Sequence, residues 1–203
     1  MVLYYILLPL AWIVFHIGFR VRAEGRDNLK KIRTRGYILA PNHISAIDPV
    51  FVIITRFWGR RMIVFAKKEL FEINAFLSWF FRCAGAMCVR GTKEEAAVID
   101  ETVARCQNGE SLLIFPEGTR YKGEEGGAGE FKQGAFRIAV KTGAPVVPVA
   151  ITGARALFEN NGNLCHPGTV RIRVLPPIQT AGMSRAEQKQ LPDAVRQTIL
   201  AEL

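Results

Sequence analysis

Short apolar runs alternate with longer segments of helical periodicity along most of this chain, and this alternation limits the folds open to it. Strand-length apolar runs separated by helical segments are typical of βαβ units. The predicted strands cover residues 36–40, 62–66, 86–90, 111–115, 145–151 and 169–175. The predicted helices cover residues 49–57, 71–82, 93–107, 131–142 and 184–202. The sequence therefore predicts an α/β fold with a mostly parallel central sheet flanked by helices.

Two of these helices have recognisable start signals. Thr92 with Glu95 forms a capping-box pattern at the start of the third helix, and Ser184 with Glu187 repeats the pattern at the last one. Pro192 should break or restart the last helix, because proline lacks the backbone N–H and clashes with the preceding turn.

A histidine and an aspartate lie five positions apart, directly after the strand predicted at 36–40. Histidine can take and return a proton near neutral pH, and a carboxylate bonded to one ring nitrogen leaves the other free as a base. Five residues of regular helix turn through about 500°, so His43 and Asp48 can meet only in a loop or a tight first turn. No serine or cysteine in recognisable nucleophile surroundings lies nearby, so such a base would activate a substrate hydroxyl directly. Alternatively, Asp48 and Pro49 are an N-cap and first helical residue, and His43 binds backbone.

The strand predicted at 111–115 leads into a second polar segment, Phe115-Pro116-Glu117-Gly118-Thr119-Arg120. Glycine lets a ligand approach the main chain, and the planar fork of arginine suits bidentate contact with phosphate. A surface turn with a solvated arginine is the alternative. Ligands of open α/β sheets bind at the carboxyl ends of strands, and both polar segments follow predicted strands, which favours a functional site.

Together, Asn42-His43-x4-Asp48 and residues 115–120 resemble two motifs of the 1-acyl-sn-glycerol-3-phosphate acyltransferases, also called lysophosphatidic acid acyltransferases. Three further segments resemble blocks of that family: residues 85–90, 131–135 and 146–151. The resemblance runs from about Val21 to Arg173. Tyr121 stands where a serine often follows the arginine, which bears on the local shape of the acceptor site.

The resemblance implies an enzyme of phospholipid biosynthesis. It would move a fatty acyl group from acyl-CoA or acyl-carrier protein to the free sn-2 hydroxyl of lysophosphatidic acid and give phosphatidic acid. His43 would be the general base and Asp48 its partner. The residues implied in substrate binding are Arg90, Glu117, Gly118, Thr119, Arg120 and Lys132, although Lys132 is equally well a surface lysine. Members of the wider superfamily acylate other lysophospholipids and amine-bearing lipids. The acyl thioester is a co-substrate, and no cofactor is expected.

The first 19 residues contain no formally charged side chain, whereas residues 20–35 carry seven basic and two acidic ones, +5 of the chain's net +9. A helix of this length is roughly 28 Å long, close to the ~30 Å hydrocarbon core of a bilayer. We therefore predict a membrane-associated helix over residues 1–20 and an acyltransferase domain over residues 21–203. The helix could span the bilayer or lie in its interface, and a buried core helix is the alternative.

Charge alone does not separate an anionic membrane from nucleic acid as the partner of residues 20–35. A non-catalytic binding module would explain the charge and the apolar segment, but it assigns no role to His43, Asp48 or residues 117–120. Residues 20–35 also contain no aromatic side chain on which bases could stack. We therefore expect membrane lipids and no nucleic acid as partners. If the helix spans, the positive block places the catalytic domain on the cytoplasmic face, with the bacterial inner membrane as the expected location.

Three other features complete the prediction. Residues 71–82 carry five aromatic side chains in twelve positions, which suit either the core or an acyl groove or membrane-facing surface. Residues 122–130 hold four glycines and predict a mobile loop beside the acceptor site. The cysteines have no metal or redox spacing and suit a reducing compartment, so no metal site is indicated.

Overall fold

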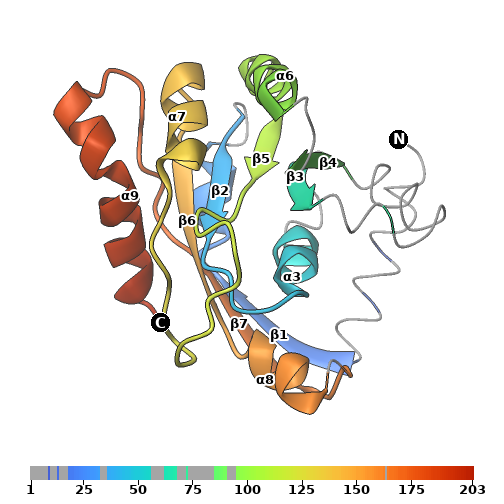
Figure 1. Ribbon diagram of the computed structural model, residues 1–203. Helices are drawn as coiled ribbons and strands as arrows, with labels where there is room; N and C mark the ends of the chain where they lie inside the picture. The colour runs from blue at the N-terminus through green and yellow to red at the C-terminus, as the bar shows by residue number, and fades with distance from the viewer. Residues whose placement is uncertain are drawn as a thin grey trace.

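The computed structural model of the chain describes residues 9, 13, 18–32, 36–55, 62–67, 72, 85–90, 95–162 and 164–203. Its strands belong to one seven-stranded sheet (Figure 1). They are β1 (Phe19–Glu24), β2 (Ile38–Pro41), β3 (Met62–Lys67), β4 (Ala86–Arg90), β5 (Ser111–Leu113), β6 (Val146–Thr152) and β7 (Gly168–Val174). The helices are α2 (Asp27–Lys30), α3 (Asp48–Thr55), α6 (Glu95–Gln107), α7 (Gln133–Thr142), α8 (Ala154–Leu157), the 3-10 turn η1 (Glu159–Asn161) and α9 (Arg185–Leu200).

The strand order across the sheet is β1-β7-β6-β2-β5-β3-β4. Neighbouring strands run parallel everywhere except between β6 and β7. The predicted α/β class with a mostly parallel sheet is therefore confirmed, and each predicted strand is present within a residue or two of its expected ends.

β1 is a strand that the sequence analysis did not predict. It pairs in parallel with β7, from Phe19 opposite Gly168 to Glu24 opposite Arg173. Its burial alternates, with Phe19 in the core and Arg20 exposed, as expected of an edge strand with one solvated face. Phe19 and Arg20, which the sequence analysis assigned to the end of the membrane-associated helix, are therefore part of the sheet.

Most of the helix predicted over residues 1–20 lies outside the described residues, as does the helix predicted over 71–82 apart from Glu72. The capping box predicted at Thr92 also lies outside them. In the part of the chain that the structure describes, we find no helix with the length and hydrophobicity needed to cross a membrane.

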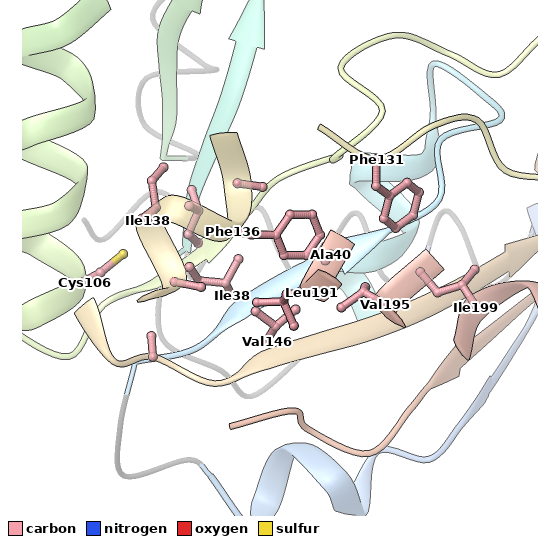
Figure 2. Close-up of a cluster of buried hydrophobic side chains, with 14 of the residues drawn as sticks. Ile38, Ala40, Cys106, Phe131, Phe136, Ile138, Val146, Leu191, Val195 and Ile199 are labelled. Atoms are coloured by element: carbon pink, nitrogen blue, oxygen red, sulfur yellow. The ribbon is translucent and has the colours of Figure 1, made fainter. Parts of the chain in front are cut away.

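Helices cover both faces of the sheet, with α6, α7 and α9 on one face and α3 and α8 on the other (Figure 1). Because side chains alternate along a strand, β2 contributes to two cores: Leu39 packs on the α3 side and Ile38 on the α7 and α9 side. Figure 2 shows the second core, in which Phe136 of α7 and Val195 of α9 lie close to Ile38 and Val146. The two cores hold β2 from both faces and so fix the strand that leads into the predicted histidine motif.

α9 runs unbroken through Pro192, so the predicted break was wrong. Pro192 is itself buried, and its neighbours Leu191 and Val195 pack in the second core. That tertiary packing offsets the one backbone bond that proline lacks. The predicted capping box is confirmed, with Ser184 N donating to Glu187 Oε2 at 2.7 Å and Glu187 N donating to Ser184 Oγ at 3.3 Å.

Candidate active site

The two polar segments singled out in the sequence leave the carboxyl ends of adjacent parallel strands. β2 and β5 are paired, with Ile38 opposite Leu112. The histidine loop (residues 42–47) joins β2 to α3, and the arginine loop (residues 114–121) follows β5. A hydrogen bond from Tyr121 N to His43 O, 2.7 Å long, connects the loops directly. The structure therefore brings the two predicted motifs together at one edge of the sheet.

Asn42 fixes the start of the histidine loop. Its side chain is fully buried and spans to β6, where Nδ2 donates to Ile151 O at 3.0 Å and Oδ1 accepts from Ile151 N at 2.8 Å. Both polar groups of the amide are satisfied, so the loop leaves β2 in a defined direction.

His43 and Asp48 meet across a tight loop, as the predicted pairing requires. His43 Nδ1 lies 2.9 Å from Asp48 Oδ2. The same oxygen accepts from the backbone N–H groups of Ile44 and Ser45, at 2.8 and 2.7 Å. Asp48 is the first residue of α3, yet its carboxylate bonds to residues that precede the helix. It therefore closes the histidine loop and holds the imidazole, and the simple N-cap interpretation does not describe it.

The two members of this pair differ in exposure. The Asp48 side chain is 0% exposed, and burial raises the pKa of its carboxyl group while the hydrogen bond from His43 acts in the opposite direction. The His43 side chain is 18% exposed. Since Nδ1 is bonded to the buried carboxylate, Nε2 is the ring nitrogen left for a substrate. This arrangement suits a base whose free nitrogen receives a proton from a bound substrate.

Residues of the arginine loop hold His43 from two directions. The Phe115 ring packs on the imidazole with centroids 4.1 Å apart. Glu117 is 4% exposed, and its Oε1 accepts from His43 N at 2.8 Å while Oε2 accepts from Gly129 N at 3.0 Å. Burial raises the pKa of Glu117, although these hydrogen bonds oppose the shift. The structure thus places Glu117, predicted to contact substrate, against two backbone amides with both oxygens occupied.

Gly118, Thr119 and Arg120 lie on the outer side of the same loop. Gly118 has φ of +69° and donates its N–H to Phe115 O at 3.0 Å, which forms the turn. Thr119 is exposed. Arg120 is about half exposed, and its Nη1 donates to Glu159 Oε1 at 3.0 Å. Nε and Nη2 of Arg120 have no partner among the described residues, so one edge of the guanidinium is free to bind an anion.

The other two predicted binding residues lie farther from this centre. Arg90 ends β4, the edge strand that is three strands from β2, which corresponds to about 14 Å at ordinary strand spacing. Lys132 is exposed directly before α7, and its N–H donates to Pro116 O at 2.9 Å. Lys132 therefore lies next to the arginine loop, whereas Arg90 shares only the sheet edge with it.

Residues 122–130, predicted from their glycines to be a mobile loop, are tied to the domain at several points. Arg196 of α9 donates to the carbonyls of Ala128 and Gly129, at 2.8 and 2.7 Å. Glu125 Oε1 accepts from Gly153 N at 2.7 Å. These partners lie far away in the sequence, so the glycine content alone gave no sign of them.

Sequence reasoning gave no role to Arg155 or Glu159, which follow β6. Arg155 Nε donates to Ile44 O at 3.3 Å, and its guanidinium also donates to the carbonyls of Tyr121 and Gly123. Glu159 accepts from Ser45 and Arg120. The one available signal was positional, because a segment after a third parallel strand should reach the same edge of the sheet.

Among the described residues, no group of three or more His, Cys, Asp or Glu side chains could hold a metal ion.

We next compared the sequence and the fold of the chain with those of known proteins. A family model described as Acyltransferase matches residues 20–152, which include both loops. Because this match covers more than half of the chain, the chain belongs to the Acyltransferase family. It is 30% identical over 188 residues to the 1-acyl-sn-glycerol-3-phosphate acyltransferase of Borreliella burgdorferi, an alignment that covers 92% of this chain and 72% of that protein. The chain belongs to the 1-acyl-sn-glycerol-3-phosphate acyltransferase family.

Two further relatives support this placement. The Saccharomyces cerevisiae 1-acyl-sn-glycerol-3-phosphate acyltransferase is 29% identical over 192 residues, 92% of this chain, and the chain spans only 61% of its length. The crystal structure of the 1-acyl-sn-glycerophosphate (LPA) acyltransferase PlsC from Thermotoga maritima superposes with a TM-score of 0.73 at 28% identity. That match covers 90% of this chain and 70% of the PlsC chain.

Proposed function

We propose that the chain transfers a fatty acyl group from an acyl thioester to the free sn-2 hydroxyl of lysophosphatidate and forms phosphatidate. The observation that carries the proposal is the 2.9 Å contact between His43 Nδ1 and Asp48 Oδ2, on a loop bonded to the loop of Arg120. The relatives supply the substrate class, since each is named as an acyltransferase for 1-acyl-sn-glycerol-3-phosphate. Purified protein should convert a labelled acyl thioester and lysophosphatidate into labelled phosphatidate, and a panel of other lysophospholipids would identify a different acceptor.

The proposed reaction is direct transfer with His43 as general base. His43 Nε2 takes the proton of the acceptor hydroxyl as its oxygen attacks the thioester carbonyl carbon. The C–S bond then breaks, and the imidazolium returns the proton to the departing thiolate, so His43 ends the cycle neutral. Asp48 holds Nδ1–H and stabilises the imidazolium while it exists. Glu117 and Phe115 contribute by fixing the backbone and the ring of His43.

The acceptor phosphate is proposed to bind at the free edge of Arg120. A guanidinium offers two parallel N–H donors to phosphate oxygens, and the neighbouring turn at Gly118, with φ of +69°, carries no side chain. Thr119 is exposed next to Arg120 in the sequence, and Lys132 is exposed next to the arginine loop, so both are proposed to add contacts to the phosphate or the glycerol. Arg90, on the same sheet edge, completes the proposed substrate-binding set.

Replacing Arg120 with alanine should weaken use of the acceptor by at least about tenfold in kcat/KM, because a hydrogen bond to a charged group is worth about 1.5–3 kcal/mol. Arg120→Lys should restore only part of the loss, since a lysine lacks the planar fork. Steady-state kinetics with varied lysophosphatidate measures both effects. An unchanged acceptor KM and kcat/KM in the alanine variant would rule out Arg120 as the phosphate anchor.

We also propose that the protein acts at the cytoplasmic face of a membrane, with acyl-CoA or acyl-carrier protein as the donor. The apolar residues before β1 supply burial, and the basic residues that follow add roughly 1 kcal/mol each near an anionic surface. Only the second contribution is screened by salt. The acyl thioester, the lysophosphatidate and the phosphatidate all carry acyl chains. A site near the lipid headgroups therefore lets the lipid substrate enter from the bilayer and the product return to it.

Deleting residues 2–17 should release the protein from membranes at high salt and leave weak attachment at low salt. The deletion must stop before Phe19, whose ring packs on Phe51 with centroids 5.5 Å apart. Sedimentation with liposomes at two salt concentrations measures the effect, and activity on short-chain soluble acceptors serves as the control for folding. Full retention at high salt would identify another surface as the anchor, with residues 71–82 as the first to test.

A further inference from the structure

One short segment after β6 contacts both catalytic loops and lies beyond residue 152, where the family match ends. It comprises α8 and η1, and α8 lies beside β7 and β1 (Figure 1). Arg155 on this segment donates to carbonyls of both loops, and the carboxylate of Glu159, four residues later, accepts hydrogen bonds from both loops.

Glu159 joins the histidine loop to the side chain of Arg120. Its Oε2 accepts from Ser45 Oγ at 2.6 Å, and its Oε1 accepts from Ala46 N at 2.7 Å. The same Oε1 accepts from Arg120 Nη1 at 3.0 Å. One carboxylate therefore links the loop that carries the base to the side chain that anchors the phosphate.

The carboxylate of Glu159 is well placed to remain ionised in this position. Burial acts to raise the pKa of Glu159, but the hydrogen bonds from Ser45, Ala46 and Arg120 outweigh it and leave the pKa below its ordinary value. The Glu159 side chain is 19% exposed, so solvent reaches it less than it reaches Arg120. Glu159 holds Arg120 through Nη1, so the edge formed by Nε and Nη2 remains available to a substrate phosphate.

We propose that Glu159 is a positioning residue that fixes the distance between His43 and Arg120, and thereby selects which acceptor hydroxyl is acylated. This inference rests on the proposed function, in which Arg120 binds the phosphate. In 1-acylglycerol 3-phosphate, the free hydroxyl is on the carbon next to the phosphate-bearing carbon; in the 2-acyl isomer it is one carbon farther away. A misplacement of about 1 Å can cost roughly 10²-fold in rate, so a fixed base-to-anchor distance discriminates between these isomers.

The test uses two non-migrating ether analogues, 1-O-alkylglycerol 3-phosphate and 2-O-alkylglycerol 3-phosphate, with the full-length chain. The parent should prefer the first analogue. Glu159→Ala should raise the acceptor KM by about tenfold or more and should lower the preference ratio by a similar factor, because Arg120 is no longer held. Glu159→Gln should keep most of the preference, since its amide oxygen can still accept from Ala46 N and Arg120 and its nitrogen can donate to Ser45 Oγ.

Glu159→Asp provides a second variant if the alanine protein does not fold. It keeps the charge but is one methylene shorter, so it cannot reach both partners, and the preference ratio should again fall. Glu24→Ala is the matched control, because Glu24 also accepts from an arginine at 3.0 Å but lies on β1, three strands from β2. It should leave the ratio unchanged.

The outcomes separate the two proposals. A parent that does not acylate either analogue overturns the proposed function and this inference with it. An active parent whose preference ratio survives both Glu159→Ala and Glu159→Asp overturns this inference alone. A purely structural role would lower kcat/KM for both analogues equally and leave the ratio intact, and that result also contradicts it.

Discussion

His43→Ala should lower kcat by about 10²–10⁴-fold while lysophosphatidate still binds. The variant loses the proposed general base, but it keeps Arg120 and the backbone bonds of the histidine loop, because Glu117 and Asp48 bind backbone N–H groups of that loop. Turnover of labelled thioester gives kcat, and equilibrium binding of lysophosphatidate to the variant gives the affinity.

His166→Ala is the matched control for this experiment. His166 is exposed on the segment before β7, far in the sequence from the histidine loop and the arginine loop, and its side chain takes no part in the hydrogen bonds that join them. We expect its kcat to equal that of the parent. A normal kcat in His43→Ala, or a loss that is equal in both variants, would contradict the role of His43 as base.

Asp48→Asn should lower kcat by about two orders of magnitude or more and leave the acceptor KM nearly unchanged. The amide oxygen can take the place of Oδ2 and keep accepting from Ile44 N and Ser45 N, so the loop remains closed. The negative charge that we propose to stabilise the imidazolium is lost. Steady-state kinetics separates kcat from KM, and thermal unfolding shows whether the variant remains folded.

Asp100→Asn makes the same change on the surface of α6, where Asp100 is 72% exposed and pairs with Lys141 at 3.3 Å. It should have no effect on kcat. If Asp48→Asn is folded and turns over at the rate of the parent, the carboxylate serves only to close the loop.

The sheet was largely predictable because its central strands are buried on both faces and so appear as apolar runs between helical segments. β1 was missed for a physical reason: it is an edge strand whose Arg20 and Arg22 face solvent, so its alternation was hidden within a basic block. Pro192 misled the prediction of α9 because local propensity does not include the packing of that helix on the sheet.

The residues of the candidate site also fall into those that a local sequence pattern indicated and those that it did not. His43 and Asp48 were found because partners five positions apart leave a local pattern. Glu159 was not found, because it lies 114 positions after Ser45. The two residues come into contact only because the strand order places the segments after β2 and β6 side by side. Glu117 stood in a recognisable motif, but its partner is a backbone N–H 74 positions away, and no side-chain pattern marks such a bond.

Direct transfer by His43 is tested most directly by a rapid-quench experiment on the parent enzyme with an acyl-labelled thioester. Without lysophosphatidate, we predict neither thiol release nor label on the protein. After addition of lysophosphatidate, thiol and labelled phosphatidate should appear together in equal amounts, and His43→Ala should abolish both. A burst of thiol before the acceptor is added, with the acyl label retained on the protein, would contradict direct transfer and require a covalent acyl-enzyme.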